Sequence, residues 1–242
     1  MIASILRVVK SPEIWQSIPI GQTSKNMIKT ISDIDIGSAL RRSPTQQRSK
    51  AKVKRILEEA DRLLPELGYD ALVQAPWPIV EASGVTAGVF YNYFENGEAV
   101  LEALSILYFE QARALIDELL ADDFPTWESA IDAINDRFAE FYGQPTVREL
   151  WLNNRLTQVA KLAGRDINEH IHKGIVELIE RSAHGDIKFS PIGATFLSYL
   201  GDRLLRYVFE QEEEARPAFI DEVKRAMKSY TATYAVGPKI AD

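Results

Sequence analysis

The sequence lacks cysteine, long apolar runs and any alternating strand pattern. Without cysteine, the 242-residue chain can form neither disulfides nor thiolate metal sites, which suits a reducing compartment. Its apolar start, MIASILRVV, is broken by Arg7 and lacks a secretory cleavage pattern. No apolar stretch reaches the roughly 18 residues that a membrane span needs. We therefore expect a cytoplasmic protein without membrane association.

Motifs of the common enzyme classes are also missing. The sequence has no glycine-rich phosphate loop, serine-nucleophile elbow or zinc-protease motif. His170 and His172 lie two positions apart on a predicted helix, so they face different sides and make poor joint metal ligands. The scattered acidic residues fit solvated helix faces. We expect no catalytic residues, no metal and no other cofactor.

Positive charge is scarce overall but concentrated in one segment. The formal net charge of −7, taken alone, argues against nucleic-acid binding. From Leu63 to Ala112 the sequence has no basic residue, whereas from Ser38 to Leu57 it has seven basic residues and no acidic one. These seven are Arg41, Arg42, Arg48, Lys50, Lys52, Lys54 and Arg55.

Apolar residues recur at three- and four-residue spacing, which predicts an all-α fold. The first clear helix begins near Ser49 and ends at Gly68, with a bend or an early end expected at Pro65. Two short helices follow, one from Pro78 to Gly84 and one from Thr86 to about Phe94.

The remainder of the chain is predicted to be helical as well. A helix of roughly 25 residues begins at Asn96 or Gly97. Asp166 and Glu169 have the spacing of a capping box for a later helix. The other predicted helices are Thr126–Gly143, Pro145–Ala163, Pro191–Glu210 and one from about Pro217 to before Gly237.

The two short helices and the glycine-containing turn between them, EASGVTAG, form a helix-turn-helix pattern. With its flanks, ILEEADRLLPELGYDA and VFYNYFENGEAVLEAL, this region resembles the DNA-binding domain of the tetracycline-repressor (TetR) family of transcriptional regulators. The most specific marks are the Gly68-Tyr69 helix end, the turn from Ala82 to Thr86 and the block of Gly88, Tyr91, Tyr93 and Phe94.

The resemblance implies that the third helix enters the major groove while the second crosses the phosphate backbone. Thr86 would cap the third helix and reach a phosphate, while Ala87 and Gly88 would allow close approach to base edges. Phe90 and Phe94 would point inward, although all four rings of this block could instead belong to the core. The residues implied to contact DNA are Arg48, Lys50, Lys52, Thr86, Ala87, Gly88, Tyr91, Asn92 and Tyr93.

The sequence departs from the usual family pattern near this helix. Gly97 stands where the family usually has a lysine, and Ala87 stands where a basic residue is common. The stretch LVQAPWP is slightly longer than usual. The basic segment before the first helix would therefore supply most of the attraction to DNA. The alternative is that this segment is only a solvated surface.

Prolines and glycines interrupt residues 1–44, which we interpret as an irregular extension. The resemblance divides the rest into a DNA-binding domain (45–96) and a ligand-binding and dimerisation domain (97–242). The ligand would be a small apolar or aromatic effector. Each candidate contact could instead belong to the core or the surface. The ligand candidates are Tyr108, Phe138, Phe141, Tyr142, Trp151, Arg155 and His170.

The two C-terminal helices are apolar on more than one face. We expect them to pack against their copies in a symmetric four-helix dimer interface, although burial within one protomer is the alternative. The candidate dimerisation residues are Phe196, Leu200, Leu204, Val208, Val223, Met227 and Tyr230.

The sequence thus favours a one-component, ligand-responsive transcriptional regulator, with repression as the preferred direction. A homodimer would bind a pseudo-palindromic double-stranded DNA operator, and the ligand would weaken binding by changing the separation of the two reading helices. One alternative is a divergent member that has lost operator binding and acts as a protein-interaction or small-molecule-binding module. Another is an enzyme or carrier on a helical bundle, for which the sequence offers no catalytic constellation.

Overall fold

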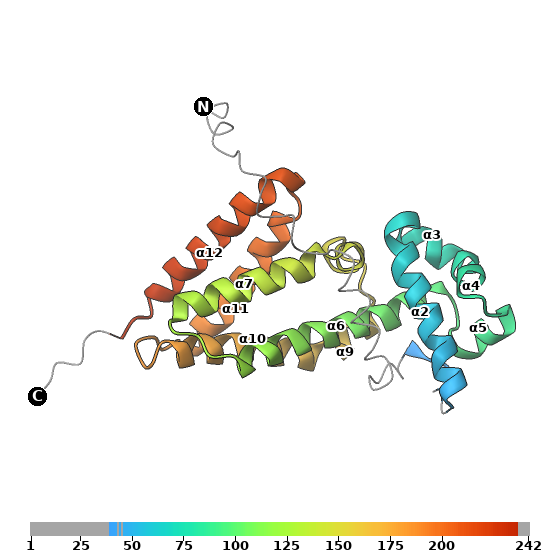
Figure 1. The fold of residues 1–242 in the computed structure, drawn as a ribbon, viewed down its shortest axis with the longest axis horizontal. Helices are drawn as coiled ribbons and strands as arrows, with labels where there is room; N and C mark the ends of the chain where they lie inside the picture. Colours follow the sequence, from blue (N-terminus) through green and yellow to red (C-terminus); the bar gives the residue numbers. More distant parts are fainter. Residues whose placement is uncertain (1–38, 43, 45, 237–242) are drawn as a thin grey trace, which may run out of the picture. The chain divides into compact units, whose positions relative to one another are not determined.

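The computed structural model describes residues 39–42, 44 and 46–236, and within them it contains helices and no strand (Figure 1). An isolated bridge between Ile187 and Ala235 is the only extended pairing in this part of the chain. The all-α prediction is confirmed. Most of the predicted N-terminal extension, 1–44, lies outside the described residues. Across the described helices, none is long and apolar enough to cross a membrane.

The first described helix, α2 (Gln47–Leu67), buries one apolar face and ends at Gly68, whose φ of 82° suits glycine. The helix continues through Pro65 for two more residues, so the early end expected there is wrong. The next helix, α3 (Tyr69–Gln74), follows Gly68 directly and was not predicted. Its last residues belong to the stretch that is longer than usual for the family.

The helix-turn-helix is present as predicted. The second helix of this motif is α4 (Trp77–Ser83), which ends at Gly84 with a left-handed φ of 63°. The third, α5 (Ala87–Tyr93), begins after Thr86, whose hydroxyl oxygen accepts a hydrogen bond from the amide of Val89 at 3.3 Å. These caps involve neighbours within three residues, which is why the sequence alone predicts them.

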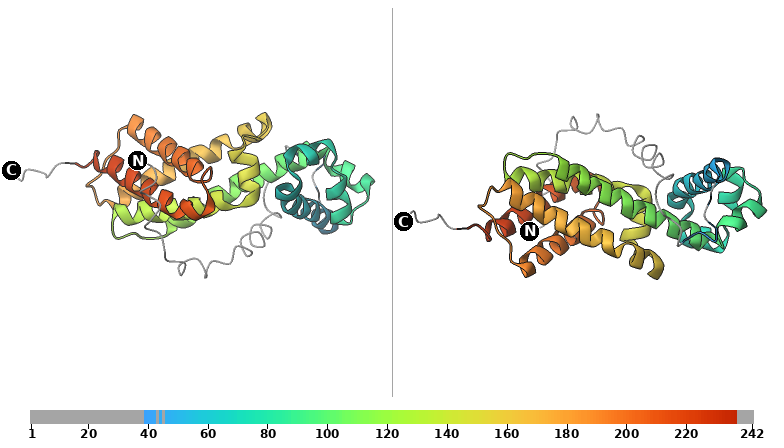
Figure 2. Two further views of the ribbon diagram at one scale, coloured as in Figure 1. Left: turned by 90° about the horizontal axis from the view of Figure 1, so that it is seen from above. Right: turned by 90° about the horizontal axis from the view of Figure 1, so that it is seen from below.

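The long helix α6 (Gly97–Ala121) begins at Asn96, which caps its first turn. It runs from the group of α2 to α5 into a second group of helices (Figures 1 and 2). In that group, α7 (Trp127–Gly143) begins with a capping box between Thr126 and Ser129. The second group also contains α10 (Arg165–Ser182), α11 (Pro191–Val208), a 3-10 turn (Glu213–Ala215) and α12 (Arg216–Ala232).

The prediction of one continuous helix from Pro145 to Ala163 is wrong. The chain instead forms a short helix α8 (Pro145–Val147), a π-helical turn η4 (Arg148–Leu152), a non-helical break, and a second short helix α9 (Gln158–Ala163). In the break, Asn154 has a left-handed φ of 55°, a conformation that asparagine tolerates better than most residues. Thr157 then caps α9.

The predicted capping box of Asp166 and Glu169 is also wrong. Helix α10 starts at Arg165, directly after Gly164, and no side chain caps it. Glu169 instead forms an ion pair with Lys173, 2.6 Å away on the same helix.

Candidate DNA-binding and effector sites

The aromatic rings of α5 divide between the core and the surface. Phe90 and Phe94 are fully buried, with ring centroids 5.9 Å apart. Tyr91 is exposed and touches Phe90 edge to face, Asn92 is exposed, and Tyr93 is half-buried. The alternative in which all four rings are core is therefore excluded. The helix presents a hydroxyl and a carboxamide outward from a rigid aromatic base.

Gly88, in the first turn of α5, has no packing reason to be glycine. It is exposed, and a Cβ atom built there would meet no other atom within 4 Å. Glycine in a helix costs about 1 kcal/mol relative to alanine. A partner outside the chain that approaches the helix closely would explain its presence.

The basic segment lies beside this helix. The backbone amide of Arg41 donates a hydrogen bond of 2.9 Å to the carbonyl oxygen of Tyr93, at the last residue of α5. Arg41 and Arg42 are both exposed. The backbone of this basic segment is thus tied to the C-terminal end of α5, which has no basic residue of its own. Among the predicted DNA contacts on α2, Arg48 is exposed, whereas Lys50 and Lys52 are half-buried.

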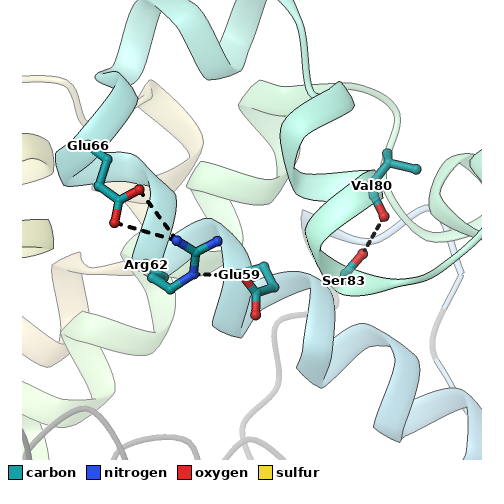
Figure 3. Close-up of polar contacts among 5 residues, drawn as sticks. All are labelled: Glu59, Arg62, Glu66, Val80 and Ser83. Atoms are coloured by element: carbon teal, nitrogen blue, oxygen red, sulfur yellow. Dashed lines mark hydrogen bonds and ion pairs between the residues drawn. The ribbon is translucent and has the colours of Figure 1, made fainter.

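Further along α2 the positive charge is neutralised. The guanidinium of Arg62 lies between two carboxylates, 2.8 Å from Glu59 and 3.4 Å from Glu66 (Figure 3). On the neighbouring helix α4, the hydroxyl of Ser83 donates to the carbonyl oxygen of Val80 and is likewise used within the chain (Figure 3). Arg62 therefore adds no net positive charge to the C-terminal half of α2.

We call the helices α6 to α12 the regulatory region and the helices α2 to α5 the DNA-binding region. In the regulatory region, a cluster of buried aromatic rings is formed by α6, α7 and the turn η4. The ring of Trp151 lies 4.5 Å from that of Phe109 and 5.1 Å from that of Phe141, between centroids. Phe109 was not predicted to belong to it. We call this group the aromatic cluster; its members are Tyr108, Phe109, Phe138, Phe141, Tyr142 and Trp151.

One polar atom of the aromatic cluster has no partner in the structure. The indole N–H of Trp151 is buried and donates to no acceptor. A buried donor without an acceptor costs about 1–3 kcal/mol. This atom is the clearest position in the aromatic cluster where a ligand could supply a missing interaction.

Helix α11 binds the edge of the aromatic cluster through polar contacts. The hydroxyl of Tyr142 donates to Asp202, and Arg206 donates to Asp202 at 2.8 Å and to the carbonyl oxygen of Trp151 at 2.8 Å. Burial, and next the charge of Asp202, raises the pKa of Tyr142 above its ordinary value. The Tyr142 hydroxyl therefore stays protonated and acts as a donor.

Tyr108 connects the aromatic cluster to the DNA-binding region. Its hydroxyl donates a 2.6 Å hydrogen bond to the carboxylate of Asp61 on α2, and Thr146 of α8 donates to the backbone oxygen of Asp61. Burial raises the pKa of the Asp61 carboxyl above its ordinary value, while the bond from Tyr108 opposes this shift. The hydroxyl of this predicted ligand residue is thus already engaged within the chain.

The structure does not bring the other two ligand candidates to the aromatic cluster. Arg155 forms a two-bond ion pair with Asp70 of α3, at 2.9 and 3.0 Å, and its guanidinium lies over the ring of Tyr69. His170 lies at the surface of α10, 2.6 Å from Asp117 of α6.

The candidate dimerisation residues on α11 and α12 fall into two groups, those that are buried within the chain and those that are not. Val208, Val223 and Met227 are buried within the chain, so their side chains are covered without a second copy. The predicted residue Phe196 is exposed, and Leu200, Leu204 and Tyr230 are half-buried.

A stripe of large exposed residues runs along α11. Ile192 is 82% exposed and Tyr199 is 63% exposed, and Phe196 and Tyr207 lie on the same face. We call these four residues the α11 stripe. Large apolar side chains gathered on one exposed face are typical of an interaction surface.

Within the described part of the chain, no group of three or more His, Asp or Glu residues is arranged to hold a metal ion.

Comparisons with known proteins agree with this architecture. Residues 125–235 match the family described as "Tetracyclin repressor-like, C-terminal domain". No curated protein matches the sequence closely enough to count as a relative.

Solved structures resemble the chain over most of its length. A TetR-family transcriptional regulator from Streptomyces coelicolor is 18% identical, with a TM-score of 0.56, over 76% of this chain and 99% of its own. The TetR family transcriptional regulator PfmR from Thermus thermophilus is 18% identical, with a TM-score of 0.55, over 78% of this chain and 97% of its own.

Residues 125–235 thus match the C-terminal domain of the tetracycline-repressor (TetR) family. The chain as a whole has the fold of the TetR-family regulators with which it is compared.

Proposed function

We propose that this chain is a TetR-family transcriptional regulator, which binds a double-stranded DNA operator as a homodimer and releases it when a small effector occupies the regulatory region. The observation that carries the proposal is the arrangement around α5: outward Tyr91 and Asn92, an unfilled exposed position at Gly88, and a basic segment bonded to Tyr93. Such a role requires access to the genome, which agrees with the cytoplasmic location expected from the sequence.

In this proposal, affinity and discrimination come from different residues. Thr86, Tyr91 and Tyr93 donate hydroxyl hydrogens to phosphates, which positions the helix. Gly88 allows close approach to base edges, as does Ala87. Asn92 reads a base through its carboxamide. The basic segment neutralises phosphates without regard to sequence.

The test begins with selection of bound sequences from random DNA, followed by titrations at several salt concentrations. Changing Arg48, Lys50 and Lys52 together to Gln should weaken binding to selected and random duplexes about equally. The slope of log affinity against log salt should fall by roughly one unit for each phosphate that is no longer neutralised. Asn92→Ala should instead change the preferred sequence and leave the slope nearly unchanged.

A matched control removes the same charge elsewhere. Arg113, Lys161 and Arg165 are exposed residues of the regulatory region, and changing all three to Gln should leave the salt slope as in the wild type. If the variant of the basic segment keeps full affinity and slope, its assignment to DNA is refuted.

For the effector, we propose a planar aromatic molecule that carries a hydrogen-bond acceptor. It would insert between rings of the aromatic cluster and accept from the indole N–H of Trp151, which has no partner in the structure. Thermal-shift measurements should compare naphthalene with 2-naphthoate, which share a ring system and differ in the acceptor. The naphthoate should stabilise the wild type more, and Trp151→Phe should remove this difference. Equal shifts in the wild type would refute the role of Trp151.

For dimerisation, we propose that the α11 stripe is the centre of the interface, flanked by the half-buried residues Leu200, Leu204 and Tyr230. The buried residues Val208, Val223 and Met227 would support this surface from within each protomer.

One alternative is supported by a specific observation. No basic residue occurs from Leu63 to Ala112, and Arg62 is neutralised by two glutamates. A protein-interaction module that has lost operator binding would show these features. If the wild type binds no DNA even at low salt, this alternative becomes the better interpretation.

A further inference from the structure

Helix α3 is packed against the start of α6 so closely that only glycine fits there. A Cβ atom built on Gly97 would lie 2.0 Å from the backbone oxygen of Leu72 and 3.1 Å from the Cα of Val73. Leu72 itself is fully buried. The same contact explains why the lysine usual in the family is missing at this position.

The outer end of α3 is held by the regulatory region. Arg155 binds both carboxylate oxygens of Asp70, and its guanidinium lies 5.5 Å from the centre of the Tyr69 ring. Two residues later, the hydroxyl of Thr157 donates a 2.6 Å hydrogen bond to Glu102 of α6. The break between η4 and α9 therefore rests on both α3 and α6.

This break follows the aromatic cluster by only a few residues. Trp151 belongs to the π-helical turn η4, and Asn154 adopts a left-handed conformation just before Arg155. Single π-helical turns are often found at functional sites. Movement of Trp151 would thus be passed along a very short length of chain to Arg155.

We propose that Tyr69, Asp70 and Arg155 form a latch that positions α3, and with it α4 and α5, relative to the regulatory region. This proposal rests on the proposed function, because its consequence appears only when a dimer binds two half-sites. The latch is a direct route from the aromatic cluster to the DNA-binding region that does not pass along α6. Asp70 and Arg155 act as positioning residues and touch no DNA.

The physical effect is one of preorganisation. When the latch is closed, the two α5 helices of a dimer hold a defined spacing, and less conformational freedom is lost on binding to an operator. The ion pair is largely exposed, with 43% of Arg155 and 64% of Asp70 accessible, so its strength is limited by solvent. Opening it should therefore weaken operator binding by about two- to fivefold.

The test compares Arg155→Gln with Asp70→Asn on a selected duplex that contains two half-sites. Both variants should weaken binding to this duplex by about two- to fivefold. On a duplex with a single half-site both should bind as the wild type does. If the substitutions acted only through the net charge of the protein, Arg155→Gln would weaken DNA binding and Asp70→Asn would strengthen it. The reason is that the first removes a positive charge and the second a negative charge.

The structure offers a matched control and a rescue. Arg137 and Glu118 form an ion pair of similar exposure, 45% and 66%, but both lie in the regulatory region. Arg137→Gln and Glu118→Gln should leave binding to both duplexes unchanged. The charge exchange Asp70→Arg with Arg155→Asp should recover operator affinity relative to either single change.

The possible results distinguish a failure of the latch from a failure of the proposed function on which it rests. Shifts of opposite sign, no shift, or equal weakening on the single half-site would overturn the latch while DNA binding stands. Failure of the wild type to bind any selected duplex would overturn the proposed function, and the latch with it.

Discussion

The helix ends of the DNA-binding region (α2–α5) and the aromatic cluster of the regulatory region (α6–α12) depend on contacts of different range. In the first, helix ends depend on neighbours: Gly68 and Gly84 take positive φ values, and Thr86 caps its own first turn. In the second, side chains of the aromatic cluster are held by distant partners. Tyr142 and Asp202 are 60 positions apart in the sequence.

This difference decides what a sequence can disclose about each region. Local caps and turns are encoded within a few residues, so the helix-turn-helix is visible in the order of the amino acids alone. A cavity or an interface depends on which distant faces meet. Three experiments test how far the contrast between the regions holds.

The largest expected effect concerns the surface of the regulatory region. Tyr199→Arg places a second positive charge on the α11 stripe, one turn before the exposed Arg203, and if the stripe is a dimer interface this charge is buried beside a like charge. We expect the dimer dissociation constant to rise by about 100-fold, a cost of about 2.7 kcal/mol. Analytical ultracentrifugation across micromolar concentrations measures it.

The control is Leu162→Arg, at a residue that is also exposed and apolar but lies on α9, away from the stripe. It should leave association unchanged. A wild type that remains monomeric over this range would contradict the dimer and restrict the regulatory region to contacts within one chain.

The next effect compares two glycines of the DNA-binding region and its border. Gly97→Ala forces a Cβ against the Leu72 backbone and should lower the free energy of unfolding by about 1–3 kcal/mol. Gly88→Ala has open space and should raise it by up to about 1 kcal/mol through helix propensity, while weakening operator binding. Chemical denaturation and duplex titration measure both.

If Gly88→Ala leaves DNA affinity unchanged, the close approach proposed at that position is refuted. If Gly97→Ala is neutral, α3 is not held against α6 as the structure indicates.

The smallest effect lies where the two regions meet, at Asp61. Because burial raises the pKa of this carboxyl, its protonated form is favoured in the folded chain. Its contribution to stability is therefore complete below the ordinary pKa and is lost as pH rises through the raised value. Asp61→Asn keeps an oxygen that can accept from Tyr108, and should raise the free energy of unfolding at neutral pH by up to about 1 kcal/mol.

Denaturation at several pH values should show this gain disappearing as the pH falls towards about 4. Asp123→Asn, at an exposed residue, is the control and should have no pH-dependent effect. A gain that is constant with pH would contradict burial as the cause.

The sequence by itself determined the class of the fold and the details of the helix-turn-helix. The period of the apolar residues predicts helices, and Thr86 and Gly84 place the ends of the short ones. The resemblance read from the sequence also implied that Phe90 and Phe94 point inward, and the structure buries both rings while Tyr91 is exposed.

The sequence was less informative where long apolar and polar stretches allowed several arrangements. It predicted one helix from Pro145 to Ala163, because the spacing is compatible with one and no proline or glycine interrupts it. The break appears only when Arg155 and Thr157 find partners on α3 and α6. It also predicted most members of the aromatic cluster, but not the unpaired donor of Trp151.

Only the tertiary structure decided which apolar faces are covered and which remain exposed. On α11 and α12, Val208 and Val223 are buried while Tyr199 stays exposed, although all three are large and apolar in the sequence. Likewise, the sequence shows only that Gly97 replaces the lysine usual in the family. The structure gives the reason, because α3 packs directly against this position. Periodicity is a property of a single helix. Burial and close approach are properties of a pair of helices, so they depend on which distant part of the chain packs against the helix.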